Sequence, residues 1–113
     1  MAKYERTFTG DFRGLLTAIE QGIMKGSVSA SLEDQSNFEA GDVQVAVRVF
    51  ERFSWMGSNR VSLSVTMVGQ GGQIFVSAIT SGGSQAVFFK INTFGEGAFL
   101  DKLREIVDGY AGR

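Results

Sequence analysis

Apolar and polar residues alternate in four consecutive runs between Asp42 and Ile91, and a segment of helical periodicity flanks these runs on each side. Alternation with a period of two is typical of strands that bury one face, whereas apolar residues three and four positions apart indicate an amphipathic helix. Glycine-rich segments separate the runs, and adjacent glycines accept the positive φ angles of tight hairpins. The pattern therefore predicts an antiparallel meander between two helices.

The first third of the chain predicts one helix between two strands. Lys3 to Thr9 alternates only moderately well and is predicted to be an edge strand. A helix is predicted from Asp11 to Lys25, with Asp11 as its N-cap and Gly26 as a left-handed C-terminus. Ser27 to Leu32 predicts a half-buried strand, and the polar stretch from Glu33 to Gly41 predicts a loop.

The remaining strands and the second helix follow the same reasoning. The predicted strands are Val43 to Trp55, Val61 to Met67, Ile74 to Ile79 and Ala86 to Ile91. Valines at 43, 45, 47 and 49 give the first of these the clearest alternation in the chain. Thr93 and Glu96 have capping-box spacing before a final helix. The predicted fold class is α+β with the order β-α-β5-α: an antiparallel meander sheet with two helices on one face, in a single domain of residues 1–113.

Composition excludes several kinds of function. The chain has no histidine and no cysteine, so Ser-His-Asp, Cys-His and zinc mechanisms are excluded, and we expect no cofactor. A net charge of −1 provides no basic field for phosphates, so we expect no nucleic-acid partner. The N-terminus lacks the apolar core of a signal peptide and no run is long enough to span a membrane, which predicts a cytoplasmic protein without a membrane partner.

Two groups of residues are candidates for ligand binding. In the segment Thr80 to Gln85, Ser81, Gly82, Gly83 and Ser84 can form an anion nest, although a plain hairpin turn explains the same residues. On the predicted strands, Arg48 and Arg52 share one face and Lys90 stands on the last strand, a mixture that suits an acidic or aromatic ligand. The alternative is a solvated sheet face.

Three stretches resemble an uncharacterised family of small bacterial proteins of about this length, which is a domain of unknown function. They are GSVSASLED (Gly26 to Asp34), GDVQVAVRVFERFSW (Gly41 to Trp55) and SAITSGGSQAVFFKINTFGEGAFL (Ser77 to Leu100). The resemblance covers essentially the whole chain and implies no activity, cofactor or catalytic residue. The order of elements resembles the helix-grip architecture of TATA-binding-protein-like and Bet v 1-like folds, in which an antiparallel sheet wraps a long C-terminal helix.

The last two predicted strands are apolar on both faces, and two helices can cover only one face of a sheet. We therefore expect a non-enzymatic domain that self-associates through its sheet, with a dimer as the simplest homo-oligomer. The alternative is a carrier or sensor of a small apolar or anionic molecule, with a pocket between the sheet and the C-terminal helix. An enzyme that uses Glu51 or Lys90 is a third hypothesis.

Overall fold

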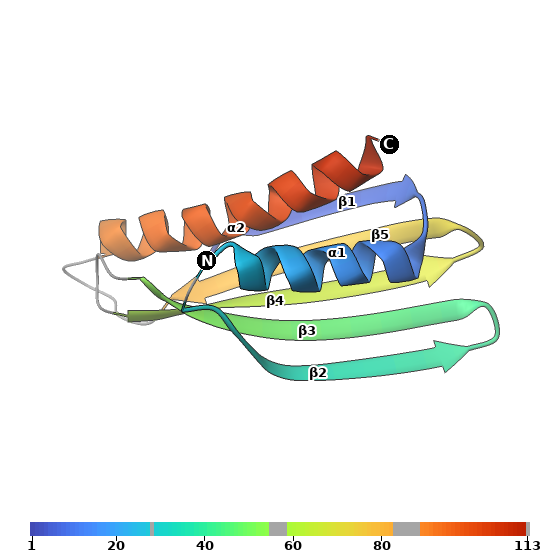
Figure 1. Cartoon of the computed structure of the whole chain (residues 1–113), viewed down its shortest axis with the longest axis horizontal. Helices are drawn as coiled ribbons and strands as arrows, with labels where there is room; N and C mark the ends of the chain where they lie inside the picture. Colours follow the sequence, from blue (N-terminus) through green and yellow to red (C-terminus); the bar gives the residue numbers. More distant parts are fainter. Residues whose placement is uncertain (28, 55–58, 83–88, 113) are drawn as a thin grey trace.

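The computed structural model describes residues 1–27, 29–54, 59–82 and 89–112 as one antiparallel sheet with two helices (Figure 1). The strands are β1 (Lys3–Thr9), β2 (Ser31–Ala40), β3 (Val43–Ser54), β4 (Asn59–Gln70) and β5 (Gln73–Gly82), in the sheet order β1-β5-β4-β3-β2. Both helices, α1 (Phe12–Lys25) and α2 (Phe89–Ala111), lie on the same face of the sheet (Figure 1). The predicted α+β meander is confirmed.

Three predicted elements differ from the structure. The strand predicted from Ser27 to Leu32 begins at Ser31. The segment from Glu33 to Gly41 is not a loop, because most of it forms β2, which pairs with β3 and has a register shift between Leu32 and Asp34. The last predicted strand is absent at Phe89 to Ile91, which form the first turn of α2, while 83–88 lie outside the described residues. Within the described chain the order is therefore β-α-β4-α.

Helix α1 begins at its predicted N-cap. Asp11 has an extended backbone, and its Oδ2 accepts a hydrogen bond of 2.9 Å from the N–H of Gly14. Its C-terminus differs from the prediction, because Gly26 has right-handed angles (φ −77°, ψ −8°). A Cβ on Gly26 would lie 2.6 Å from Cε of Lys102. This glycine therefore allows close approach to α2 rather than a left-handed turn.

Glycines along α1 bring the two helices together. Gly14, Gly22 and Gly26 are separated by multiples of four residues, so they lie on one side of the helix. A Cβ on Gly22 would lie 2.5 Å from Cδ1 of Ile106, and one on Gly14 would lie 2.3 Å from Oη of Tyr110. Side chains of α2 therefore pack directly against the backbone of α1 at these glycines. A methyl group there would require the side chains of α2 to move.

The core lies between the helices and the face of the sheet that they cover. Alternate residues of β4 and β5 are buried there, together with the apolar stripe of α1 and one face of α2. The buried apolar side chains are Leu15, Leu16, Ile19, Ile23, Ala46, Phe50, Val61, Leu63, Val65, Met67, Ile74, Val76, Ala78, Phe99, Leu100, Leu103 and Val107. Strand β3 contributes only Ala46 and Phe50 to this list, and β1 and β2 contribute none. Tyr4 and Phe8 of β1 are partly buried and pack against the core, so the helices cover mainly β5 and β4 and part of β1.

Candidate functional site

The face of the sheet opposite the helices is open within the described residues (Figure 1), and an apolar row crosses it. Phe38 is the register partner of Val45, Val45 of Val68, and Val68 of Phe75. Cross-strand partners on one face have Cβ atoms about 5 Å apart, so these four side chains contact one another in sequence. The exposed fractions of Phe38 and Phe75 are 62% and 36%. The row therefore presents aromatic surface to solvent at both ends.

The clear alternation along β3 belongs to this open face and not to the core. Val43, Val45, Val47 and Val49 are only partly buried, whereas Ala46, Arg48 and Phe50 between them are buried. The valines form an apolar column that crosses the row at Val45. Ile79 of β5 is 41% exposed and adds a further apolar side chain to the same face, separated from Val49 by Ser64 of β4.

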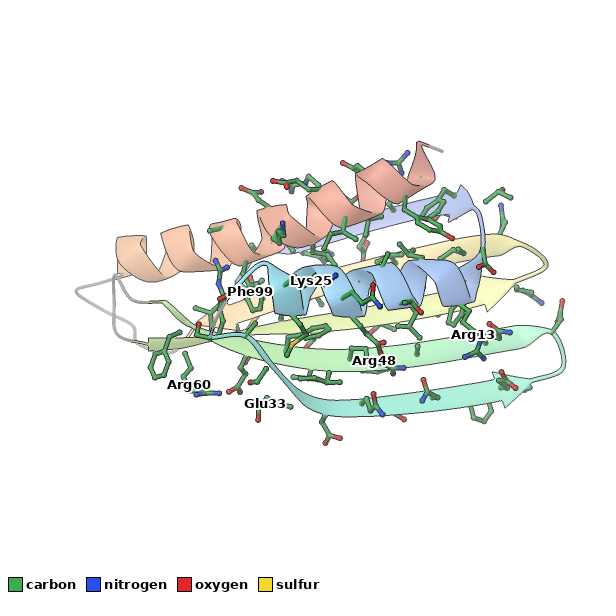
Figure 2. All side chains as sticks on the ribbon, viewed as in Figure 1. Arg13, Lys25, Glu33, Arg48, Arg60 and Phe99 are labelled. Atoms are coloured by element: carbon green, nitrogen blue, oxygen red, sulfur yellow. The ribbon has the colours of Figure 1, made fainter. Side chains whose placement is uncertain are left out.

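Many of the other residues of the open face are small and uncharged. Among them are Thr7, Ser36, Ser62, Ser64, Thr66 and Ser77, which the register places on the same side as the row. Charged residues on this face lie towards its margins, with Lys3 and Glu5 on the edge strand β1 and Asp34 on the edge strand β2. At one end, Nε of Arg60 donates to Oε1 of Glu51 at 2.6 Å, and Nη2 of Arg60 lies 3.5 Å from Oε2 of Glu33 (Figure 2). An apolar centre with a charged rim is the usual layout of a protein interface.

The two edges of the sheet carry features that discourage pairing with another strand. The β2 edge has three acidic residues, Glu33, Asp34 and Glu39, and an irregular register at Glu33. The β1 edge is seven residues long and includes Lys3 and Arg6. Charges and bulges on edge strands oppose edge-to-edge association. Contact through the sheet is therefore favoured on the open face.

The structure places Arg48 and Arg52 on the helix side of β3, so the solvated-face alternative is wrong for Arg48. Arg48 is 5% exposed; its Nε donates to Oε2 of Glu20 at 2.6 Å, and its Nη1 donates to the carbonyl oxygens of Val47 and Ser36 at 2.9 and 3.3 Å. The guanidinium of Arg52 lies 4.6 Å from the ring centre of Phe99, and burial lowers the pKa of Arg52.

Of the other predicted site residues, the structure describes Ser81 and Gly82 in full, and the register places Gly82 in the same cross-strand row as Arg52, with Val61 between them. Ser81 and Gly82 form the end of β5, where they pair with Ser62 and Val61, so the turn predicted at Ser81 begins later. Gly83 and Ser84 lie outside the described residues. The backbone of Lys90 is in the first turn of α2, and its side chain lies outside the description.

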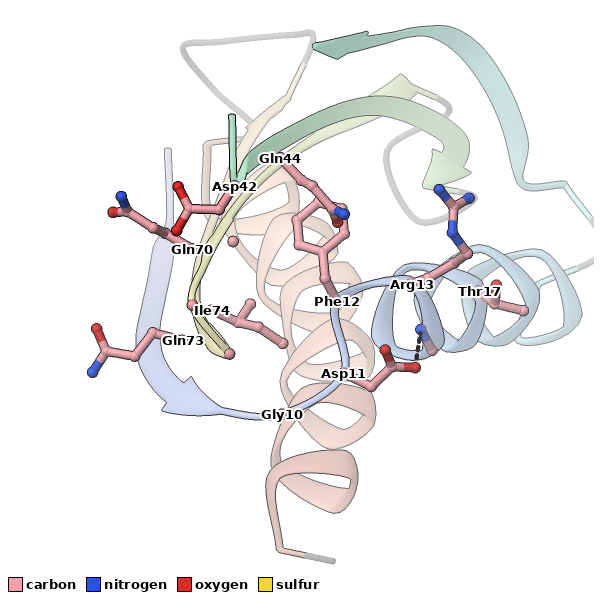
Figure 3. Close-up of a pocket in the computed structure, with 14 residues that line it drawn as sticks. Gly10, Asp11, Phe12, Arg13, Thr17, Asp42, Gln44, Gln70, Gln73 and Ile74 are labelled. Atoms are coloured by element: carbon pink, nitrogen blue, oxygen red, sulfur yellow. Dashed lines mark hydrogen bonds between the residues drawn. The ribbon is translucent and has the colours of Figure 1, made fainter. Parts of the chain in front are cut away.

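A hollow of about 720 Å³ lies at the N-terminal end of α1 (Figure 3). Its wall combines the first turns of α1 with the β4–β5 hairpin, whose Gly71 and Gly72 have positive φ angles of 58° and 86°. Asp11, Arg13 and Gln44 line it (Figure 3). The hairpin glycines were predicted from the sequence, but the hollow was not, because it depends on where α1 lies against the sheet.

A second hollow of about 200 Å³ lies beside the first, between α1 and the β2–β3 hairpin. The two share Phe12, Arg13 and Gln44, and the smaller one also reaches Arg48 and Glu39. No described side chain of α2 lines either hollow. The described part of α2 instead meets the sheet through buried side chains such as Phe99 and Leu103.

Together these features define a small α+β domain with one covered sheet face, one open apolar face and two polar hollows beside its first helix. The chain belongs to a family of unknown function, DUF6054, whose model matches residues 1–111. No curated protein matches the chain. Neither described helix has the length and apolar character needed to cross a membrane. Among the described residues, no three acidic side chains gather as a metal site.

Proposed function

We propose that the domain self-associates by packing the open faces of two copies against each other, which makes a two-layer β-sandwich with the helices on the outside. The observation that supports this most strongly is the exposed apolar row from Phe38 through Val45 and Val68 to Phe75. Sheets that pack face to face bury such alternating apolar residues in a layer about 10 Å thick.

The size of the face suits a stable dimer. Five strands spaced about 4.8 Å apart, each contributing about ten residues of about 3.3 Å, give a face of roughly 800 Å². Standard protein interfaces bury about 800 Å² on each partner. A second copy would therefore cover the open face almost completely.

The chemistry of the face suits a second copy of the same chain better than a differently charged partner. A two-fold interface places the same patch on both sides, so the patch must complement itself. The valines, hydroxyls and exposed phenylalanines of this face satisfy the requirement, because they are uncharged, and Lys3, Glu5 and Asp34 lie on the two edge strands. The rim charges on Glu51 and Arg60 are already paired within one chain, so their burial at the margin leaves no isolated charge.

A lysine in the apolar row tests the proposal. Val45→Lys places a charge at the crossing of the row and the column, and we expect it to raise the dimer dissociation constant by at least about 100-fold, which is about 2.7 kcal/mol. Glu105→Lys, on the exposed side of α2, is the matched control and should leave the constant unchanged. Sedimentation equilibrium measures both, and circular dichroism confirms that each variant is folded.

Phe75→Thr is a second variant in case the lysine prevents folding. It removes an exposed ring from the row but keeps a residue that favours strands. A folded Phe75→Thr or Val45→Lys protein that associates as strongly as the original chain would show that the open face is not the interface.

A second candidate function is the binding of a small molecule, which the hollow beside Arg48 favours. The hollow lies next to α1 and the β2–β3 hairpin, whereas the location predicted from the sequence lies between the sheet and the C-terminal helix. Thermal unfolding of the protein with small charged molecules tests this candidate, because a ligand that binds only the folded state raises the melting temperature.

A further inference from the structure

The smaller hollow lies between two parts of the chain that are separated in sequence, helix α1 and the β2–β3 hairpin. Helix α1 contributes Phe12, Arg13 and Leu16, and the β2–β3 hairpin contributes side chains on its helix-facing side. These are Asn37, Glu39, Gln44 and Arg48, which the register places on one face of the two strands. The site thus combines two guanidinium groups, one carboxylate and two amides over an apolar floor.

Arg48 has hydrogen-bonding capacity left over. Its Nε and Nη1 groups donate to Glu20 and to two backbone carbonyls, whereas its Nη2 makes no hydrogen bond to any described residue. The side chain is 6% exposed. A buried N–H group without an acceptor costs about 1–3 kcal/mol. An acceptor held in the hollow would satisfy Arg48 where bulk water has little access.

Arg13 and Glu39 supply opposite charges at the same hollow (Figure 2 shows Arg13 and Arg48). Both side chains belong to exposed residues, and neither forms an ion pair with any described residue. Arg48 is already balanced by Glu20. The unpaired charges at the site are therefore one positive and one negative, which together complement a ligand that carries both signs.

We propose that this hollow binds a free α-amino acid. The carboxylate is held between Arg13 and Arg48, since guanidinium groups match carboxylate geometry. The ammonium group lies against Glu39, and the amides of Asn37 and Gln44 hold the remaining polar atoms. A dianion such as phosphate is disfavoured by the two carboxylates, Glu20 and Glu39.

The volume suits this class of ligand. The hollow has a volume of about 200 Å³, which is well above what one water molecule needs. Phe12 and Leu16 offer apolar contact to a small or medium side chain. The inference rests on the second candidate function, small-molecule binding, and is independent of self-association.

Thermal unfolding and calorimetric titration with the twenty standard amino acids, butyrate, butylamine and inorganic phosphate test the inference. We expect at least one amino acid to raise the melting temperature in proportion to the logarithm of its concentration, while butyrate, butylamine and phosphate bind at least about tenfold more weakly. Arg13→Gln and Glu39→Gln should each weaken amino-acid binding by about tenfold or more. Lys25→Gln, at the other end of α1, and Glu105→Gln, on α2, should not change it.

Different outcomes of these experiments test the class of ligand and the location of the binding site separately. Binding of butyrate or phosphate as tight as that of any amino acid would overturn the zwitterion assignment but leave small-molecule binding standing. Amino-acid binding that survives both Arg13→Gln and Glu39→Gln would overturn this location. If none of the probes binds at millimolar concentration, both the amino-acid inference and the second candidate function fail.

Discussion

Val45 of β3 and Val68 of β4 are register partners on the side of the sheet that faces away from both helices. Phe38 and Phe75 extend this pair on the two neighbouring strands. The clearest alternating signal in the sequence thus marks an uncovered surface, while the covered side of β3 carries Ala46, Phe50 and a buried arginine. This arrangement is the physical basis of the proposed dimer.

Gly69 of β4 is predicted to be essential for the seating of α1. A Cβ at this position would lie 2.6 Å from Cδ2 and 3.2 Å from Cγ of the Phe12 ring. Because the Phe12 ring belongs to the first turn of α1, either the ring must rotate out of its position or the helix must shift to make room. We expect Gly69→Ala to lower the free energy of unfolding by about 1–3 kcal/mol, measured by urea denaturation.

Gly109→Ala is the matched control for this substitution. Gly109 lies in α2, and a Cβ there would meet no atom within 4 Å. Alanine favours helices over glycine by up to about 1 kcal/mol, so this variant should be equally or more stable than the original chain. A Gly69→Ala protein as stable as Gly109→Ala would contradict the close packing of Phe12 on β4.

The ion pair between Arg48 and Glu20 should matter more than an exposed pair of the same length. Both Arg48–Glu20 and Arg104–Asp101 have N–O distances of 2.6 Å, but the Arg48 side chain is 6% exposed and that of Arg104 is 44% exposed. Glu20→Ala leaves a buried charge, and we expect a loss of about 2 kcal/mol, reduced from the fully buried case because water reaches Glu20.

Asp101→Ala is the corresponding control on α2. Removal of one partner from an exposed pair changes stability by about 0.5 kcal/mol or less. Chemical denaturation of both alanine variants gives the comparison directly. If Glu20→Ala and Asp101→Ala lower the free energy of unfolding equally, the ion pair with Glu20 stabilises Arg48 little, and water reaches Arg48 through the hollow.

Acid should weaken the attachment of α2 to β1 through Asp108. Its carboxylate accepts hydrogen bonds from Oη of Tyr4 and from Nη1 of Arg6, and these bonds lower the pKa of Asp108 below its ordinary value of 3.8. A lowered pKa in the folded state stabilises the protein above the ordinary value, and this contribution is lost as the pH falls through the folded-state pKa.

Asp108→Asn removes this pH-dependent contribution while keeping the shape of the side chain. The difference in unfolding free energy between the original chain and Asp108→Asn should be constant near neutral pH and should shrink below about pH 4. Denaturation curves across that range measure it. A difference that stays constant down to about pH 2 would show that Asp108 is not selectively stabilised as a carboxylate.

The sequence predicted those elements whose local pattern and tertiary environment agree. The apolar stripe of α1 is buried and Asp11 caps it as expected, because a one-sided helix stripe can be satisfied only against a core. The β4–β5 hairpin follows from Gly71 and Gly72, whose positive φ angles are needed for a two-residue turn.

Strand β2 was missed for a physical reason. It is an edge strand with nine of its ten residues exposed, so neither face imposes an apolar alternation on its sequence. Its pairing with β3 comes from the backbone and from the hairpin at Gly41, which has a positive φ of 60°. Polarity alone therefore made Glu33 to Gly41 resemble a loop.

The candidate site was predictable only in part. The shared strand face of Arg48 and Arg52 follows from alternation, but alternation does not say which face the helices cover. Arg13 and Glu39 are far apart in sequence, and only the position of α1 beside the β2–β3 hairpin brings them to one hollow. The likeness to TATA-binding-protein-like and Bet v 1-like folds stays a prediction.

Sedimentation velocity of the unmodified protein over a dilution series from micromolar to nanomolar concentration tests the central claim most directly. We expect the sedimentation coefficient to fall from the dimer value to the monomer value on dilution, and the melting temperature to fall with it. A monomer throughout the micromolar range, with a melting temperature independent of concentration, would contradict the claim that the open face is a self-association surface.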